Sequence, residues 1–270
     1  MTSTASERLI VDEASVPWPR DTSRPRNLML EDVVGEAPDL DLVIPAFNES
    51  ARLPATLLRT LDYLERVPWR TRVVVVDNGS ADDTAGIVRD AAAGRDLALS
   101  VIGCARPGKG AAVRRGLLNA TAQYVGFFDA DLATPLETLD LTMSLLRDGA
   151  TAVVASRHAP GAAIVRQQPW GRRIGGGAFR LLTQGVVHGV HDTQCGFKFF
   201  ERSAVTRALV RCRTNGFAFD AELLGRIQAE GGRIVEVPVA WADDSASTFR
   251  PLRDGVASFR AVLDMRAGTR

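Results

Sequence analysis

The stretch RVVVVDNGSADDTAGIVRDAAA, residues 72–93, decides the fold class because its hydrophobic pattern changes period halfway along. Its first part is a run of β-branched residues that ends at Asp77, which is typical of a strand buried on both faces of a sheet. The second part begins with residues that favour a helix start and continues at helical spacing. A strand followed directly by a helix indicates a βαβ unit, and therefore a parallel sheet.

Segments of the same two kinds alternate on both sides of this stretch. Beside 72–77, strands are predicted over 41–45, 98–103, 124–129, 151–156 and 233–241, and beside the helix that ends at 93, helices are predicted over 53–67, 110–122, 178–190 and 217–232. A loop rich in Arg, Gln, Gly and Pro follows 151–156, a polar loop enters a short strand after 191, and Pro238 suggests an edge position for the last strand. We therefore predict an α/β fold with a Rossmann-like, mostly parallel central sheet flanked by helices.

The chain length favours one large domain with a segment on either side. The 270 residues are 46% hydrophobic, which is enough for a single core without a second full domain. We predict a mobile N-terminal arm over residues 1–38, one globular domain over 39–248, and an amphipathic C-terminal tail over 249–270. In the tail, apolar residues recur at helical spacing among arginines, so it could lie on an anionic bilayer or dock on the core.

Composition excludes several classes of protein. Lys and Arg number 33 against 32 Asp and Glu, and a net charge of +1 does not indicate a nucleic-acid partner. The three cysteines lack metal-type spacing and suggest a reducing compartment. No apolar run approaches the length of a membrane span. We expect a cytoplasmic protein, with possible contact at the cytoplasmic face of a membrane, and the sequence leaves the oligomeric state open.

The predicted strands end in chemically notable residues. Ligands of open parallel sheets bind beyond the carboxyl ends of the strands. Asp129 and Asp131 follow the strand at 124–129, and two acids there can face one ligand. Mg²⁺ or Mn²⁺ fits, because such hard cations take oxygen ligands from one or two carboxylates and from substrate phosphates. The alternative is a solvated turn or the start of the next helix.

Several motifs together resemble glycosyltransferase family 2, the inverting nucleotide-sugar enzymes of the GT-A fold. The motifs in the first half are VIPAFNE, VVVVDNGSADDT, RPGKGAAVRRG and FFDADLATP. Downstream, ASR, DTQCGFKFF, FAFDAELL and EVPVAW are similar to the branch of dolichyl-phosphate β-glucosyltransferases and polyprenyl-phosphate glycosyltransferases. The resemblance covers about residues 40–245 and implies that 39–248 is a GT-A catalytic domain.

This resemblance implies an activity. The enzyme would move a hexose, with glucose from UDP-glucose as the first choice and a GDP-mannose type of donor as the other, to a polyprenyl or dolichyl phosphate. Mg²⁺ or Mn²⁺ would assist by neutralising charge on the departing nucleoside diphosphate. Two alternatives stay open: transfer to a soluble hydroxyl acceptor with Asp220 as the general base, or a non-catalytic nucleotide-binding protein.

The resemblance also assigns roles to residues on the donor side. The nucleotide-sugar would contact Pro45, Phe47, Glu49, Asp77, Gly79, Lys109, Asp129, Ala130 and Asp131. Among these, Asp131 and Asp129 would hold the metal, Asp77 would accept a hydrogen bond from the base, and Gly79 would supply a tight turn. Phe47 could instead belong to the core and Glu49 could cap a helix. Asn78 stands where many family members have an acid, and we expect only a turn residue there.

A segment without acids supplies the acceptor side. Between Ser156 and Arg180 there are five arginines and no Asp or Glu, which suggests anion binding or contact with anionic lipid. By the resemblance, Arg157 would reach the donor diphosphate and join Asp129, Asp131 and Asp220 as the catalytic set. The acceptor phosphate would be bound by Arg166, Arg172, Arg173, Gln194 and Lys198. Asp192 could orient an arginine or the sugar.

Overall fold

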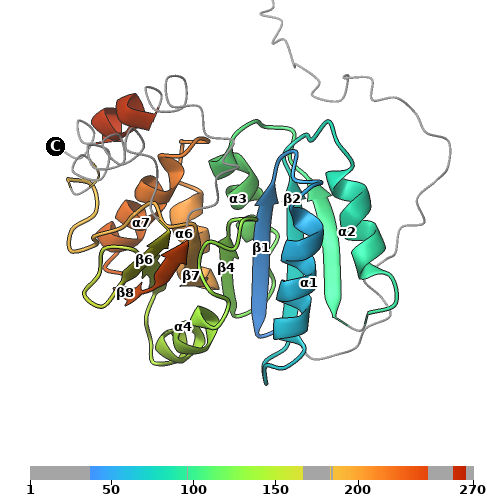
Figure 1. Cartoon of the computed structure of the whole chain (residues 1–270). Helices are drawn as coiled ribbons and strands as arrows, with labels where there is room; N and C mark the ends of the chain where they lie inside the picture. The colour runs from blue at the N-terminus through green and yellow to red at the C-terminus, as the bar shows by residue number, and fades with distance from the viewer. Residues whose placement is uncertain (1–36, 96, 167–182, 184, 243–257, 266–270) are drawn as a thin grey trace, which may run out of the picture. The chain divides into compact units, whose positions relative to one another are not determined.

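The computed structural model describes residues 37–95, 97–166, 183, 185–242 and 258–265, and within these ranges seven strands form one sheet in the order β3-β2-β1-β4-β7-β5-β8 (Figure 1). The strands are β1 (Leu40–Ala46), β2 (Thr71–Asp77), β3 (Ala98–Gly103), β4 (Tyr124–Phe128), β5 (Ala152–Ser156), β7 (Phe197–Glu201) and β8 (Ile234–Pro238). Neighbouring strands are parallel except that β7 runs antiparallel to β4 and β5. The predicted α/β class with a mostly parallel sheet is confirmed.

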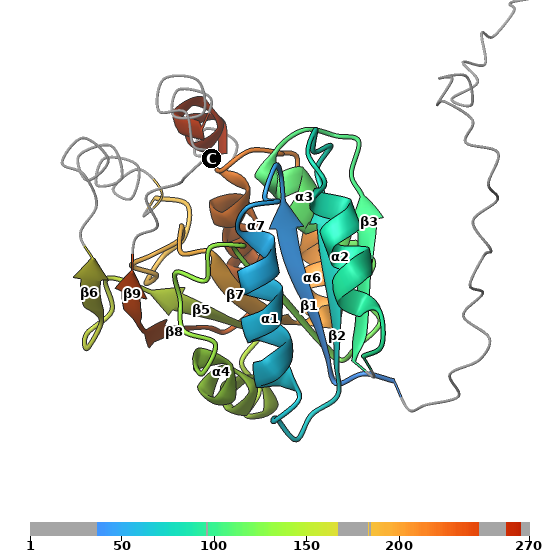
Figure 2. The ribbon, with the colours of Figure 1, turned by 45° about the vertical axis from the view of Figure 1, so that its right-hand side comes forward.

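Helices cover both faces of this sheet (Figure 2). One face carries α1 (Leu53–Leu64), α2 (Thr84–Ala92) and α4 (Thr138–Arg147), and the other carries α3 (Lys109–Leu118), α6 (Arg202–Leu209) and α7 (Phe219–Ala229). The valines of β2 explain the arrangement, because Val73 and Val75 enter one core and Val74 and Val76 enter the other. The continuous apolar run at 73–76 therefore marks a strand that is buried on both faces.

The order of the strands places a ligand site at one position along the sheet edge. From β1 the chain moves outward to β2 and β3, and then returns to β4 on the other side of β1. The carboxyl ends of β1 and β4 therefore diverge at a topological switch point, where open α/β sheets bind ligands. Phe47 follows β1 and Asp129 follows β4 at this point.

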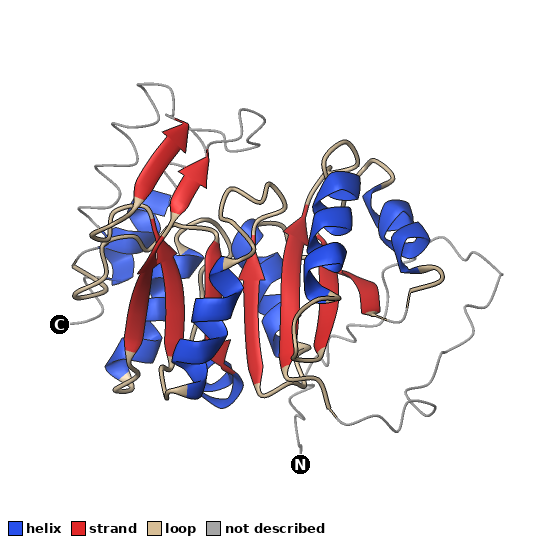
Figure 3. Ribbon diagram, turned by 60° about the horizontal axis from the view of Figure 1, so that its bottom comes forward, coloured by secondary structure: helices blue, strands red, loops and turns tan. Residues whose placement is uncertain are grey.

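A second, smaller sheet stands beside the first. It pairs β6 (Ala163–Arg166) with β9 (Ala240–Ala242), and the two strands run parallel. Figure 3 shows them as a separate ribbon beyond the tips of the neighbouring strands. Since only Val239 separates β8 from β9, the last strand of the main sheet continues directly into this ribbon.

The structure corrects several predicted boundaries. The strand expected over 233–241 is divided between two sheets at Val239, although the predicted edge position of its Pro238 part is confirmed. The loop expected up to about 177 contains β6, and α6 was not predicted. Of the helix expected over 178–190, residues 178–182 and 184 lie outside the described residues, Thr183 is helical, and residues 185–189 form turns and a bend, with a φ of 72° at Gly189.

Both predicted end segments fall partly or wholly outside the described residues. Residues 1–36 lie outside them, so the arm stays a prediction, and the described chain begins at Ala37. Residues 258–265 are helical, with Val262 buried against Ala218 while Leu263 is exposed. This piece of the tail therefore contacts the core. Among the described helices, none is both long and apolar enough to cross a bilayer.

A buried ion pair stabilises the end of the sheet where β1 and β2 begin, opposite the carboxyl ends of these strands. The Asp41 carboxylate is inaccessible and accepts hydrogen bonds from Nε and Nη2 of Arg72 at 2.6 and 3.0 Å. The backbone N–H groups of Thr121 and Ala122 also donate to it, at 2.5 and 2.9 Å. One carboxylate thus ties the starts of β1 and β2 to the turn before β4.

We predict that Asp41→Asn lowers the free energy of unfolding by about 2 kcal/mol, because a half-buried guanidinium partner and two N–H groups lose their anion. Urea denaturation followed by far-ultraviolet circular dichroism measures this. A loss below about 0.5 kcal/mol, as is usual for surface substitutions, would contradict the role of this pair.

Candidate active site

The loop after β1 is held open by hydrogen bonds from the loop after β2. Asn48 has a left-handed backbone with a φ of 55°, its N–H donates to Ser80 Oγ, and its side-chain oxygen accepts from Ala81 N. This clasp leaves the Phe47 side chain 48% exposed at the switch point. The alternative that Phe47 belongs to the core is therefore wrong, and an exposed aromatic face is present where a base could stack.

The other donor-side residues of this edge have distinct surroundings. Pro45 is half-buried in β1, and the Glu49 carboxylate lies 3.5 Å from Arg52 Nε just before α1. Gly79 has a φ of 78°, as a tight turn requires. Asp77 is half-buried and accepts a hydrogen bond from Ser80 N at 3.1 Å through Oδ1.

Asn78 does more than occupy a turn. Its Nδ2 donates to the carbonyl oxygens of Cys104 and Arg106, at 3.2 and 2.7 Å, and its Oδ1 accepts from Gly108 N at 2.8 Å. An amide can donate and accept at once, whereas an ionised carboxylate at this position could only accept. Asn78 therefore ties the end of β2 to the loop that enters α3.

Lys109 begins α3 inside a narrow contact with the start of α7. A Cβ on Gly108, whose φ is 116°, would come within 2.3 Å of Asn215 O. A Cβ on Gly110 would come within 2.4 Å of Phe219 Cβ. The glycines on both sides of Lys109 are therefore needed so that α3 and α7 can approach closely and bring Lys109 next to Asp220.

A row of alternating charges runs from the core to the strand end. Lys198 Nζ lies 3.4 Å from Asp220 Oδ1, Asp220 Oδ2 lies 4.0 Å from Lys109 Nζ, and Lys109 Nζ lies 2.8 Å from Asp129 Oδ1. Lys198 is fully buried and Asp220 is 3% exposed. Burial alone would lower the pKa of Lys109, but the charges of Asp129 and Asp220 raise it above the usual value, so Lys109 stays cationic.

The two acids after β4 fit a divalent cation. Burial and the negative charge of Asp129 raise the pKa of Asp131 above its usual value. Both offer hard oxygen ligands, and Ala130 between them is buried, with its carbonyl oxygen accepting from Thr56 Oγ1 at 2.5 Å. Thr56 is a support that the sequence did not reveal. In the described part of the chain no group of three or more His, Cys, Asp or Glu residues is arranged so that it could hold a metal ion.

Arg157 lies beyond the end of β5 and is held along one edge and on one face. Its Nε and Nη2 donate to the Asp192 carboxylate at 2.7 and 2.9 Å, and the guanidinium carbon lies 5.2 Å from the centre of the Trp241 ring. Burial alone would raise the pKa of Asp192, but the hydrogen bonds and the charge of Arg157 hold it well below its usual range. Asp192 therefore orients an arginine, which was one of its two predicted roles.

The predicted acceptor-side residues are placed unevenly. Lys198 points into the core from the middle of β7, so its predicted direct contact with an acceptor is wrong, because every side chain of this strand up to Phe200 is buried. Gln194 is half-buried, and its Nε2 donates to Thr193 O at 3.3 Å. Only the backbone of Arg166 is described, at the end of β6, and Arg172 and Arg173 lie outside the described residues.

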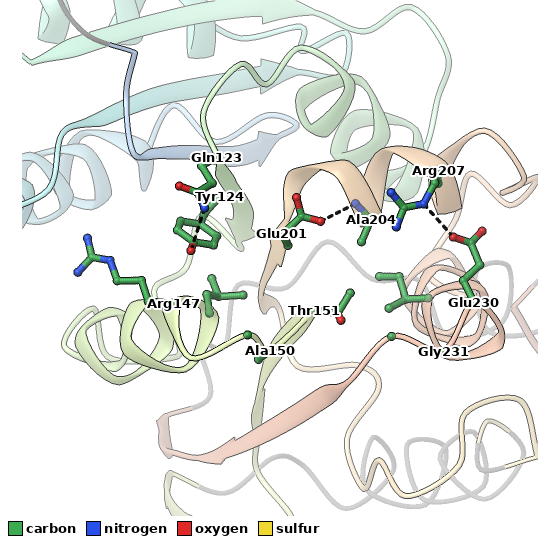
Figure 4. A pocket seen from close by; sticks show the side chains of 14 residues that line it. Gln123, Tyr124, Arg147, Ala150, Thr151, Glu201, Ala204, Arg207, Glu230 and Gly231 are labelled. Atoms are coloured by element: carbon green, nitrogen blue, oxygen red, sulfur yellow. Dashed lines mark hydrogen bonds and ion pairs between the residues drawn. The ribbon is translucent and has the colours of Figure 1, made fainter.

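A pocket of about 430 Å³ opens at the opposite edge of the sheet (Figure 4). Its lining includes Tyr124 at the start of β4, Thr151 before β5, and Arg207 and Glu230, which form an ion pair at 3.5 Å. None of the predicted site residues lines it. Because α/β ligand sites lie at the carboxyl ends of strands, we place the active site at Asp129 and Asp131 and not in this hollow.

Comparison with known sequences gives a consistent result. Residues 41–208 match the model of Glycosyl transferase family 2. The chain is 30% identical to a human dolichyl-phosphate beta-glucosyltransferase over 241 residues, which cover 84% of this chain and 74% of the relative. It is 31% identical to the Drosophila melanogaster protein of the same name, over 79% and 70%. The ALG5C protein of Trichomonas vaginalis is 33% identical, and the match spans 62% of its length.

Comparison with solved structures supports the fold. Glucosyl-3-phosphoglycerate synthase from Mycobacterium tuberculosis, crystallised with Mn²⁺, UDP and phosphoglyceric acid, aligns with a TM-score of 0.62 at 22% identity. The alignment covers 86% of this chain and 79% of that one. The expected GT-A architecture is thereby confirmed.

We predict that Lys198→Met lowers the free energy of unfolding by about 3 kcal/mol, because Asp220 then keeps a buried charge without its nearest cation. The double variant Lys198→Met/Asp220→Asn should recover at least about 1 kcal/mol of this loss, since the uncompensated charge is removed. Chemical denaturation of the two single variants and the double variant measures the coupling. Strictly additive losses would show that the two side chains do not interact.

Proposed function

Because the chain belongs to glycosyl transferase family 2, we propose that it moves glucose from UDP-glucose to a polyprenyl or dolichyl phosphate with inversion at the anomeric carbon. The observation that carries this proposal is that Asp77, Asp129 and Arg157 stand at the carboxyl ends of β2, β4 and β5, where Lys109 contacts Asp129 at 2.8 Å. The relatives named dolichyl-phosphate beta-glucosyltransferase supply the choice of sugar and of acceptor class.

The donor side offers contacts for the base and for the diphosphate of a nucleotide-sugar. Phe47 offers an exposed ring, and Asp77 offers a carboxylate oxygen for an N–H group of a uracil base. The diphosphate then lies near Asp129 and Asp131 on one side and Arg157 on the other. Arginine suits this position because its planar, permanently charged fork matches phosphate oxygens.

Asp129 and Asp131 would hold Mg²⁺ or Mn²⁺. When bound, the cation neutralises the negative charge that develops on the departing nucleoside diphosphate. Lys109 keeps Asp129 oriented through contacts of 2.8 and 2.9 Å to its two oxygens. Ala133 N donates to Asp131 Oδ1 at 3.1 Å and fixes the second carboxylate. The chain thus presents both acids in a set geometry, and charge stabilisation at a prearranged site is usually the largest contribution to catalysis.

The acceptor reacts as an anion. An oxygen of the lipid phosphate attacks the anomeric carbon, and the bond from that carbon to the donor's β-phosphate oxygen breaks as UDP departs. A phosphate monoester is already ionised near neutral pH, so it needs no general base. This agrees with the placement of Asp220, which is 3% exposed and lies between two lysines, because a base must reach the proton that it removes.

Asp131→Asn should lower the rate of glucose transfer by at least about 100-fold, because one of two metal carboxylates becomes a neutral amide. The assay follows radiolabel from UDP-glucose with Mn²⁺, with Mg²⁺ and with a chelator, and GDP-mannose serves as the comparison donor. Unchanged turnover in Asp131→Asn would refute the metal assignment. If the wild-type chain bound no nucleotide with or without the metal, the enzyme proposal would fail.

Radiolabel should move into an organic-extractable product when purified polyprenyl phosphate is the acceptor. Polyprenol without phosphate is the matched control, and we expect less than about one hundredth of the rate with it, because a neutral hydroxyl requires a base. Equal transfer to both lipids, or transfer only to soluble hydroxyl compounds, would instead support the alternative with Asp220 as base.

A further inference from the structure

One carboxylate in the 192–196 turn collects an unusual number of hydrogen bonds. Asp192 is 2% exposed and accepts five hydrogen bonds from described residues. Three come from Arg157, through its backbone N at 3.0 Å and through Nε and Nη2 of its side chain. The other two come from Gln194 N and Cys195 N, both at 3.1 Å.

These bonds determine which part of Arg157 can meet a ligand. Nε and Nη2 point to Asp192, and one face of the guanidinium lies over Trp241. Within the described residues no hydrogen bond engages Nη1, so that amino group remains the donor for an anion. A side chain held in this way loses its rotamer freedom during folding rather than during ligand binding.

The same turn contacts Asp129, one of the two acids after β4. Asp129 N donates to Gly196 O at 2.8 Å. Gly196 also leaves no room between the turn and the carboxylate, because a Cβ there would lie 1.9 Å from Asp129 Oδ2. Since Asp192 fixes the turn through Gln194 and Cys195, one carboxylate controls both the direction of Arg157 and the backbone that supports Asp129.

We propose that Asp192 is a positioning residue that fixes Arg157 against the donor diphosphate and couples it, through the 192–196 turn, to Asp129. This inference rests on the proposed function, since it takes the diphosphate as the ligand of Arg157. Asp192 itself touches neither substrate nor metal. The Glu236 side chain helps to hold Asp192 in place, because it accepts a hydrogen bond from Asp192 N at 3.0 Å.

The chain contains a matched control for this role. Asp41 is also a buried aspartate that accepts hydrogen bonds from Nε and Nη2 of one arginine and from two consecutive N–H groups of a turn. It lies at the amino end of β1, at the opposite edge of the sheet from Asp129. Asp41→Asn therefore reports what the loss of such a pair does to folding alone.

The first experiment compares Asp192→Asn with Asp41→Asn at a temperature where circular dichroism shows both to be folded. We expect glucose transfer to fall about 30-fold in Asp192→Asn and to stay within about twofold of wild type in Asp41→Asn. Affinity for UDP should fall about tenfold in Asp192→Asn, while affinity for uridine, which has no phosphate, should not change. Equal losses in the two variants would overturn the proposal.

The second experiment replaces the arginine side chain with a free cation. Guanidinium added to Arg157→Ala should raise the transfer rate about tenfold, because the Asp192 carboxylate and Trp241 still form its site. In Arg157→Ala/Asp192→Asn the same addition should have less than about a twofold effect. Equal rescue of both variants would show that Asp192 does not position the cation.

The UDP measurement separates this inference from the proposed function. If the wild-type chain binds UDP but transfers no glucose, the proposed function fails, while weaker UDP binding in Asp192→Asn with unchanged uridine binding still supports the positioning role. If wild type and Asp192→Asn bind UDP equally, the positioning role fails even where glucose transfer is observed.

Discussion

Asp129 and Asp131 carry like charges at a partly desolvated site, which is electrostatically unfavourable. Much of the neighbouring structure compensates for this unfavourable free energy. The two acids directly follow β4. This strand ends at the switch point of the sheet, where the backbone leaves the sheet and a ligand can bind. Lys109 neutralises one of them and is itself held charged by Asp129 and Asp220. The site thus combines fixed charges before any ligand arrives, which is the condition under which electrostatic stabilisation costs no reorganisation.

The antiparallel strand β7 and the turn before it add further contacts to this arrangement of charges. The strand lies between β4 and β5. Lys198, near its centre, therefore places its Nζ atom 5.5 Å from the centre of the Phe127 ring and next to Asp220. The turn that precedes β7 holds Arg157 through Asp192 and touches Asp129 through Gly196. One segment, 192–198, therefore links the acids after β4 with the arginine after β5. β4 and β5 are not neighbours in the sheet, because β7 lies between them.

The sequence predicted what depends on local pattern. The βα units, the strand ends and the acids at 129 and 131 follow from hydrophobic period and from the rule that parallel strands bind ligands at their carboxyl ends. It did not predict α6, whose N-cap residue Glu201 accepts hydrogen bonds from Ser203 N and Ala204 N although glutamate is not a preferred capping residue. The sequence also misplaced Lys198. Its strand, β7, pairs with β4 and β5, and that pairing is set by contacts between residues that are distant in the chain. Asp220 is 22 residues away from Lys198 in the sequence, and no periodicity marks that contact.

The two sides of the site differ in how firmly the described structure holds them, and the difference follows from topology. The donor side is built from ends of central strands, where each residue is tied to its neighbours by the parallel register. In the proposed function the acceptor side begins where β5 and β8 continue into the β6-β9 ribbon, outside the main sheet. Arg157 is the residue common to both, since it follows β5, pairs with Asp192 and stacks on Trp241 of β9. In the proposed function the fixed direction of this guanidinium therefore sets where the donor diphosphate lies relative to the acceptor side.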